Sequence, residues 1–211
     1  MTDNYDAVLF DFAGVLCTTP IRLMAKKADD AGLTMEQFLP IALGPLDEDA
    51  DHPFHRLERG ELSMEECRRQ LDQHARDAGF GGFPSLPTWD EVAALLVPVP
   101  EMLAVADAVR AAGLRTAVVS NNIREWSPWR GLVDADARFD TVIDSSTVGL
   151  RKPDPAIYEL ALRRLGASAD RAVFLDDFEW NLPTARELGL HVIHVHDPVE
   201  SAAELTALLE L

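Results

Sequence analysis

Residues 5–15 read YDAVLFDFAGV, a short apolar run that ends abruptly in Asp11. Val, Leu and Phe without polar alternation are typical of a strand that is buried on both faces of a parallel sheet. An aspartate at the end of such a run is costly to bury unless hydrogen bonds or an opposite charge compensate it. Gly14 suits a backbone that turns sharply and approaches a ligand closely. The stretch therefore predicts a central strand with a functional carboxylate at its carboxyl end.

Four further apolar runs have the same character and alternate with helical patterns. The five predicted strands are YDAVLF (5–10), RTAVV (115–119), DTVI (140–143), AVFL (172–175) and HVIHV (191–195). Predicted helices cover 101–112, 124–132, 155–165, 182–188 and 199–209. This alternation predicts an α/β fold, a doubly wound, Rossmann-like parallel sheet with helices on both faces.

The alternation is interrupted once, because residues 11–114 contain helical patterns and no convincing strand. These helices are predicted over 21–31, 35–43, 64–79 and 89–96, the third with Ser63 and Glu66 as a capping box. Ligands of such sheets bind beyond the carboxyl ends of the strands, so an insert after the first strand would cover the site. We predict an α/β core of residues 1–17 and 98–211, with a small helical cap of residues 18–97.

The chain of 211 residues carries a formal net charge of −17. Such an acidic surface repels phosphate backbones and anionic lipid, which argues against nucleic-acid and membrane partners. No apolar run approaches the roughly 18 residues of a membrane span, and the start MTDNYD lacks the pattern of a secretory signal. The only two cysteines, Cys17 and Cys67, are expected to be reduced thiols. We expect a soluble cytoplasmic protein, with the oligomeric state left open.

Polar side chains stand at three predicted strand ends and in the loop before the fourth strand. A single polar residue at such a position is most often a turn, cap or loop residue. Because parallel strands bring their carboxyl ends to one edge of the sheet, we expect these side chains to form one site. They are Asp11, Ser120 with Asn121, Asp176 with Asp177, and Lys152 within GLRKPDP (149–155).

These residue types suit phosphoryl chemistry. Clustered carboxylates repel one another unless a cation compensates them, and oxygen ligands suit Mg²⁺. One carboxylate can bind the metal through one oxygen and attack an electrophile with the other. Lys152, Ser120 and nearby backbone N–H groups would then hold the oxygens of a phosphoryl group.

The motifs resemble those of the haloacid dehalogenase-like hydrolase superfamily, whose small helical cap is inserted at the same point. The segments HRLERGELSMEE (55–66), GLRKPDPAIY (149–158) and FLDDFEWN (174–181) are most similar to one group within it. That group contains bacterial glucose-1-phosphate phosphatases and the N-terminal phosphatase domain of soluble epoxide hydrolases. The resemblance implies a Mg²⁺-dependent hydrolase of small organic or sugar phosphates that forms an aspartyl-phosphate on Asp11.

The resemblance also implies a role for individual residues. Mg²⁺ would be held by Asp11, the backbone carbonyl of Ala13 and Asp177, while Asp176 would either bind the metal or support a ligand. The catalytic residues would be Asp11, Ser120 and Lys152; Ser120, Asn121 and Lys152 would bind the phosphoryl group, and Asn181 would support the metal site.

Ala13 departs from the usual pattern of the superfamily. Most of its phosphatases carry a second aspartate at this position, which protonates the leaving group, a contribution generally worth about 10²–10⁴-fold in rate. A good leaving group or an acid from the cap would compensate, and the similar glucose-1-phosphate phosphatases also lack this aspartate. Two alternatives stay open: a 2-haloacid dehalogenase that uses Asp11, and a slow or non-catalytic relative that binds a phosphorylated ligand. The dehalogenase branch typically has an aromatic residue at this position, and Phe12 stands one position too early.

Four polar residues of the predicted cap are candidates to contact the substrate. They are His52, His55, Arg56 and Arg59. The alternative interpretation is that they are ordinary charges on a helix surface.

Overall fold

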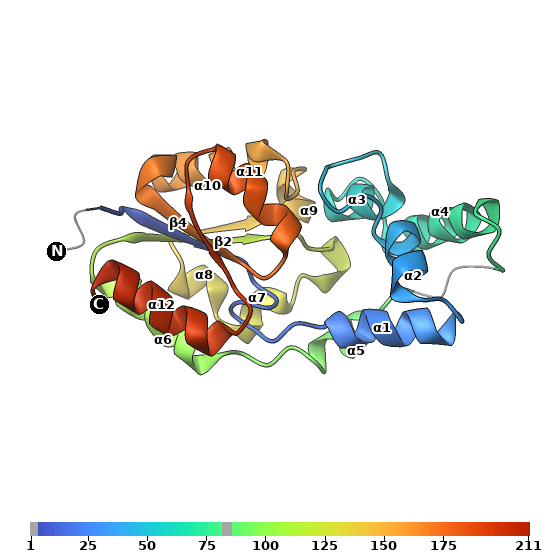
Figure 1. The fold of residues 1–211 in the computed structure, drawn as a ribbon, viewed down its shortest axis with the longest axis horizontal. Helices are drawn as coiled ribbons and strands as arrows, with labels where there is room; N and C mark the ends of the chain where they lie inside the picture. Colours follow the sequence, from blue (N-terminus) through green and yellow to red (C-terminus); the bar gives the residue numbers. More distant parts are fainter. Residues whose placement is uncertain (1–3, 82–85) are drawn as a thin grey trace.

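The computed structural model describes residues 4–81 and 86–211, and its centre is a five-stranded parallel sheet (Figure 1). Its spatial order is β3-β2-β1-β4-β5, with β1 in the middle. The strands are β1 (Ala7–Phe10), β2 (Arg115–Ser120), β3 (Thr141–Asp144), β4 (Ala172–Asp176) and β5 (His191–His194). All five predicted strands are present within two residues at each end, and the Rossmann-like α/β fold is confirmed.

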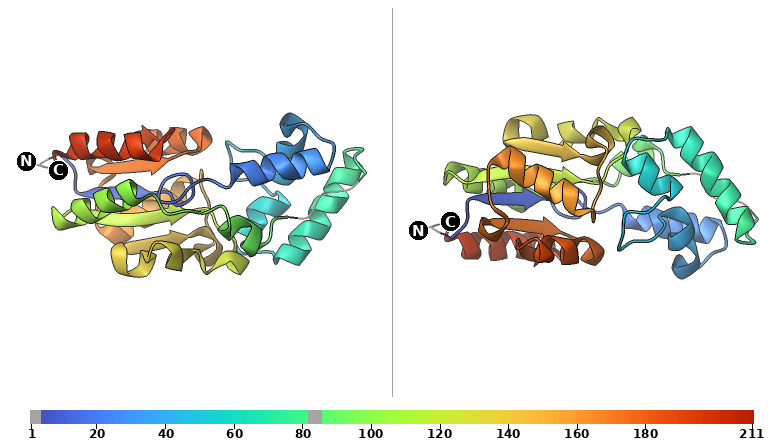
Figure 2. Two further views of the ribbon diagram at one scale, coloured as in Figure 1. Left: turned by 90° about the horizontal axis from the view of Figure 1, so that it is seen from below. Right: turned by 90° about the horizontal axis from the view of Figure 1, so that it is seen from above.

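Helices cover both faces of the sheet, which explains why the strands read as continuous apolar runs (Figure 2). Val8 and Phe10 of β1 belong to the core on one face, which includes residues of α6 (Pro100–Ala111) and α12 (Pro198–Leu209). Ala7 and Leu9 pack on the other face with α10 (Pro155–Leu165) and α11 (Leu182–Glu187).

A separate group of helices lies beyond the carboxyl ends of the strands (Figure 1). It comprises α1 (Ile21–Asp30), α2 (Met35–Ala42), α3 (Pro53–Glu58), α4 (Met64–Asp77) and α5 (Trp89–Ala93). One small cluster around Phe38 lies within this group, and a second one, around Phe54, Leu57 and Leu71, also includes Ile123 of the core. The capping box of Ser63 and Glu66 at the start of α4 is confirmed.

The chain passes between the sheet and this helical group at two places, and the two segments are hydrogen-bonded to each other. The Thr18 N–H donates to the Val97 carbonyl at 2.9 Å, and the Val97 N–H donates to the Thr18 hydroxyl, also at 2.9 Å. The Val99 N–H donates to the Leu16 carbonyl. The predicted division at residues 17/18 and 97/98 falls at this paired connection, and its exact limits stay a prediction.

The helix predicted over residues 124–132 is wrong as a single element. A 3₁₀ turn over Arg124–Trp126 and the short α7 (Trp129–Leu132) replace it, because Pro128 lacks the N–H that a continuous helix requires. Three further α-helices were not predicted, because they are too short to show an apolar period. They are α3, α8 (Ala135–Arg138) and α9 (Ser145–Val148). Among the described residues, no helix is long and apolar enough to cross a membrane.

Candidate active site

Strand register brings the predicted site residues to one level of the sheet. Phe10 of β1 pairs with Leu175 of β4, so Asp11 and Asp176 follow at the same height. Phe10 also pairs with Val118 of β2, which places Ser120 one residue beyond Asp11. Asp11, Ser120 and Asp176 are all buried, with at most 5% of each residue exposed.

Lys152 connects two of the carboxylates. Its ammonium Nζ lies 2.7 Å from Asp11 Oδ1 and 2.6 Å from Asp176 Oδ2. Burial opposes the charge of this lysine, but the two carboxylates outweigh burial and raise its pKa above the ordinary value. Since a lysine ammonium has three donors, one N–H remains beyond these two contacts. Lys152 is therefore positioned to hold the Asp11 carboxylate and one further oxygen.

The two aspartates after β4, Asp176 and Asp177, lie in different environments. Asp176 is fully buried and accepts hydrogen bonds from Lys152, from the Asn181 amide at 3.0 and 3.1 Å, and from the Phe178 N–H at 2.8 Å. Asp177 has a buried Oδ1 with no hydrogen-bond partner among the described residues. The oxygens of Asp176 are thus occupied by protein donors, whereas Asp177 has one free for a ligand.

The three carboxylates form a cluster, and two of them, Asp11 and Asp177, have a raised pKa. Asp11, Asp176 and Asp177 each offer an oxygen, and these oxygens lie within 4.8 Å of one another. Burial raises the pKa of Asp11 to about 6, with Lys152 opposing this and Asp176 adding to it. Burial, together with the charges of Asp11 and Asp176, raises the pKa of Asp177 to about 8. A cluster of negative oxygens with a single lysine is what a divalent cation would stabilise.

Gly14 makes room for Asp177. Its φ of +90° is a conformation that other residues rarely adopt, and a Cβ on it would lie 2.1 Å from Asp177 Oδ2. The sharp turn expected after Asp11 is therefore present, and its purpose is the close approach of the β1 loop to the acidic pair.

The loop after β2 holds Lys152 through its backbone. The Asn121 side chain donates to the Lys152 carbonyl at 2.9 Å and accepts from the Lys152 N–H at 2.7 Å. The contact of Asn121 with a phosphoryl group stays a prediction. In this structure the nitrogen and the oxygen of its side-chain amide both hydrogen-bond to the Lys152 backbone. The Ser120 hydroxyl faces the cavity, with a single long contact of 3.5 Å to the Asn121 carbonyl.

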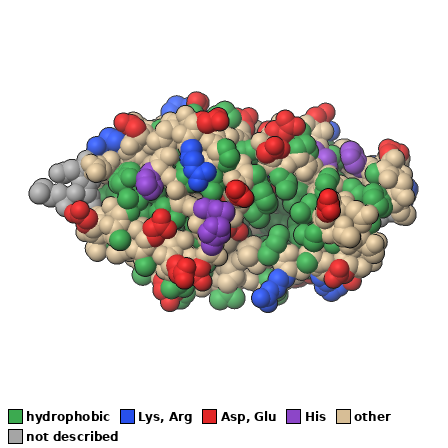
Figure 3. Space-filling view, in the orientation of Figure 1, with side chains coloured by type: hydrophobic (Ala, Val, Ile, Leu, Met, Phe, Trp, Pro, Cys, Tyr) green, Lys and Arg blue, Asp and Glu red, His purple; other side chains and the backbone are tan. Residues whose placement is uncertain are grey.

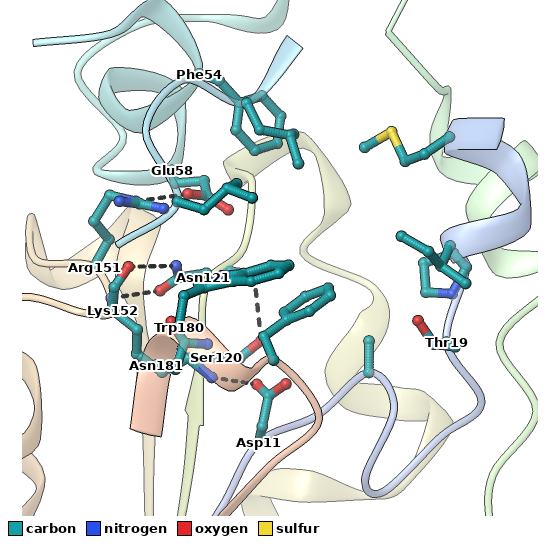
Figure 4. Close-up of a pocket in the computed structure, with 17 residues that line it drawn as sticks. Asp11, Thr19, Phe54, Glu58, Ser120, Asn121, Arg151, Lys152, Trp180 and Asn181 are labelled. Carbon is teal, nitrogen blue, oxygen red and sulfur yellow. Dashed lines mark hydrogen bonds and ion pairs between the residues drawn. The ribbon is translucent and has the colours of Figure 1, made fainter. Parts of the chain in front are cut away.

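A cavity of about 150 Å³ lies above these residues, between the sheet and the helical group (Figure 4). Asp11, Ala13, Ser120 and Asn181 line its base. Its upper walls are largely apolar, and hydrophobic side chains also surround the recess between the two parts of the molecule (Figure 3). The apolar wall residues are Ile21, Met24, Leu43, Leu46, Phe54, Phe178 and Trp180, the last two stacked with ring centroids 4.5 Å apart.

The four polar candidates from the cap do not line this cavity. His52 and His55 are buried within the helical group, where His52 Nδ1 accepts from the Phe54 N–H at the start of α3. Arg56 and Arg59 both pair with Glu61. The alternative of ordinary surface charges therefore fits Arg56 but not His52 and His55, which are buried.

Instead, the charged residues of the upper wall are Glu58 and Arg151, which form an ion pair at 2.7 Å. Neither residue was predicted as part of the site, although both lie within the motifs that carry the resemblance. The available signals were that Arg151 directly precedes Lys152 and that Glu58 lies in the segment 55–66, which contributes to the resemblance.

The chain belongs to the haloacid dehalogenase-like hydrolase family, since the model of that family matches residues 5–189. It is thus a hydrolase whose relatives include named phosphatases.

Several curated relatives match almost the whole chain. It is 32% identical over 214 residues to acyl-CoA dehydrogenase family member 10 of Mus musculus, covering 98% of this chain and 19% of the relative. It is 30% identical over 210 residues to bifunctional epoxide hydrolase 2 of Rattus norvegicus, and the match covers 93% of this chain and 37% of the relative. The chain therefore spans well under half the length of these two relatives. A sesquiterpene phosphatase of Aspergillus oryzae is 24% identical over 211 residues, with 99% of each chain covered.

Solved structures show the same fold. An enzyme of this family from Bacteroides thetaiotaomicron, in complex with magnesium and inorganic phosphate, has a TM-score of 0.63 at 19% identity, covering 92% of this chain and 96% of that chain. A predicted hydrolase of this family from Porphyromonas gingivalis has a TM-score of 0.66 at 23% identity, and the match covers 96% of this chain and 98% of that chain.

Proposed function

We propose that this chain is a Mg²⁺-dependent phosphatase that transfers the phosphoryl group of a small organic phosphate to Asp11 and then to water. The observation that carries the proposal is the position of the Asp11 carboxylate. It lines the cavity, lies 2.7 Å from the Lys152 ammonium, and has an oxygen of Asp177 within 4.8 Å of one of its own.

The donor set fits Mg²⁺. All the groups that converge are oxygens, which suit this hard cation. Asp177 Oδ1 and Asn181 Oδ1 are buried without hydrogen-bond partners among the described residues, as expected for atoms that serve a ligand. Asp11, the Ala13 carbonyl and Asp177 would hold the ion, and Asp176 would orient Lys152 and Asn181. When bound, Mg²⁺ neutralises charge on the carboxylates and on the phosphoryl oxygens.

The chain's own groups account for the two chemical steps. A carboxylate oxygen of Asp11 forms a bond to phosphorus while the ester P–O bond breaks. The leaving oxygen takes a proton from solvent, since Ala13 has none to give, and the water that attacks in the second step returns a proton to solvent. Lys152 and the Ser120 hydroxyl hold the phosphoryl oxygens, where negative charge is distributed in the transition state. Water then attacks phosphorus, the bond to Asp11 breaks, and inorganic phosphate leaves.

The cavity walls support an organic group that is mainly apolar. Met24, Leu43 and Phe54 from the helical group and Trp180 from the core surround the space above Asp11. Such walls exclude water from the reacting atoms and favour a substrate body without strong hydration. Similarity to a sesquiterpene phosphatase over the full chain supports the same class of substrate.

The dehalogenase alternative is less well supported. Phe12 is buried against Trp129, with ring centroids 4.5 Å apart, so it packs in the core and does not face the cavity. The acidic cluster is also retained.

The test is phosphate release from phenyl, p-nitrophenyl, sugar and prenyl phosphates, each with and without Mg²⁺. We expect Mg²⁺-dependent release that is fastest for the apolar substrates. Folded protein that releases no phosphate from any of them would contradict the proposal. Release of halide from 2-haloacids would instead support the dehalogenase alternative.

A further inference from the structure

The polar feature of the upper cavity wall is a buried ion pair that joins the two parts of the molecule. Glu58 stands at the end of α3 in the helical group, and Arg151 precedes Lys152 in the core (Figure 4). Arg151 Nε donates to Glu58 Oε2 at 2.7 Å, and the two residues are 5% and 8% exposed. At this depth an unpaired charge would be costly, so each group depends on the other.

Arg151 has two further acceptors in the helical group. Its Nη1 donates to the Glu48 carbonyl at 3.3 Å and lies 3.7 Å from Asp49 Oδ1. Two of the three guanidinium nitrogens, Nε and Nη1, therefore contact oxygens of the helical group. Arg151 lines the cavity, but its charge is already neutralised there.

No other cation is free to receive an anionic group in the described part of the cavity. Only four of its described lining residues are charged: Asp11, Glu58, Arg151 and Lys152. Lys152 is paired with Asp11 and Asp176 at the base. A second anionic group on the substrate would thus meet apolar side chains and the Glu58 carboxylate.

We propose that Glu58 is a specificity-determining residue that excludes substrates with a second anionic group and admits phosphates whose organic body is neutral. It acts in two ways, by repelling the second anion directly and by neutralising Arg151, the one cation that would otherwise bind it. This inference rests on the proposed function, since it assumes that the phosphoryl group lies at Asp11 and the organic body against this wall.

A pair of nearly isosteric substrates tests the proposal: 4-carbamoylphenyl phosphate, with a neutral body, and 4-carboxyphenyl phosphate, with an anionic one. For the wild type we expect kcat/KM to be at least about tenfold lower for the carboxylate, mainly through KM. In Glu58→Gln the side chain keeps its shape and can still accept from Arg151, but the negative charge is gone. The preference should therefore disappear or reverse.

Two further variants separate this role from a merely structural one. Glu61→Gln removes an exposed carboxylate just after α3, which pairs with Arg56 and Arg59, and should leave the preference unchanged. The double variant Glu58→Gln with Arg151→Gln lacks the freed guanidinium, and should lose the gain in carboxylate affinity that the single variant shows. Circular dichroism and thermal midpoints verify that each variant is folded.

The proposal is overturned if the wild type uses both substrates equally well, a result that needs no variant. It is also overturned if folded Glu58→Gln keeps the wild-type preference. Turnover of the carbamoyl substrate by the wild type reports separately on the proposed phosphatase function. Calorimetric binding of the two compounds to the wild type and to Glu58→Gln measures the charge selectivity even without turnover.

Discussion

The Lys152 ammonium and the Asp11 carboxylate are 2.7 Å apart at the base of the cavity, with 1% and 7% of their side chains exposed. Lys152 also contacts Asp176, so a single cation holds two carboxylates that come from neighbouring strands. The two partners of this contact should respond differently to substitution, because Lys152 is needed for stability as well as for activity.

Asp11→Asn is expected to lower kcat by at least about 10³-fold while the protein stays folded. Lys152 keeps Asp176 as its partner, so no buried charge is left alone. Lys152→Met should instead destabilise the protein by about 3–5 kcal/mol, because two buried carboxylates then face each other. Phosphate-release assays and urea unfolding of both variants measure this difference. Activity of folded Asp11→Asn near that of the wild type would exclude the proposed nucleophile.

Gly14→Ala should damage the metal site specifically. The new Cβ would lie 2.1 Å from the carboxylate of Asp177, and the φ of +90° adds backbone strain. Gly149→Ala is the matched control, since Gly149 has a φ of +71° with no atom within 4 Å of its added Cβ. Both variants should lose roughly 1–2 kcal/mol of stability through strain, but only Gly14→Ala should require much more Mg²⁺ for half-maximal activity. Equal Mg²⁺ requirements in the two variants would argue against this role of Gly14.

Ala13→Asp tests whether a missing acid limits the rate. Ala13 lines the cavity beside Asp11, where an added carboxyl group can reach the leaving oxygen. We expect kcat/KM to rise by about tenfold or more for phenyl phosphate, whose leaving group needs a proton, and much less for p-nitrophenyl phosphate. The ratio of the two rate changes is the measurement. An equal change for both substrates would show that another group already supplies the proton.

Two buried histidines should make the helical group sensitive to acid. Burial lowers the pKa of His52 to about 4, and the nearby His74 lowers it further. Burial lowers the pKa of His55 to about 3, and the charge of Arg151 adds to this. The unfolded chain therefore binds more protons than the folded chain below about pH 6.5, so the free energy of unfolding falls as the pH is lowered from 6.5 toward 4.

Urea unfolding between pH 7.5 and 4.5 measures this loss, which is at most about 1.4 kcal/mol per pH unit for each histidine. Replacing His52 and His55 by Asn should flatten the dependence relative to the wild type. His191→Asn is the matched control, because this histidine is exposed at the start of β5. A dependence that is identical in all three proteins would contradict the assignment.

The sequence by itself determined where the strands lie along the chain and which residues stand at their ends; their spatial order in the sheet came from the structure. Buried parallel strands are continuous apolar runs, and a polar side chain that ends such a run is easily recognised, so Asp11, Ser120 and Asp176 were identifiable without coordinates. Short elements such as α3 were not, since one and a half turns show no period.

Only the tertiary structure decided how these residues divide their work and what covers them. Asp176 and Asp177 are adjacent and chemically identical in the sequence. In the structure the Asn181 amide donates a hydrogen bond to Asp176, whereas Asp177 Oδ1 has no hydrogen-bond partner among the described residues. The Glu58–Arg151 pair joins residues 93 positions apart, and His52 and Arg59 lie close to Glu58 in the chain yet outside the cavity. Contacts of this kind depend on how the helical group packs on the sheet, which local sequence patterns do not encode.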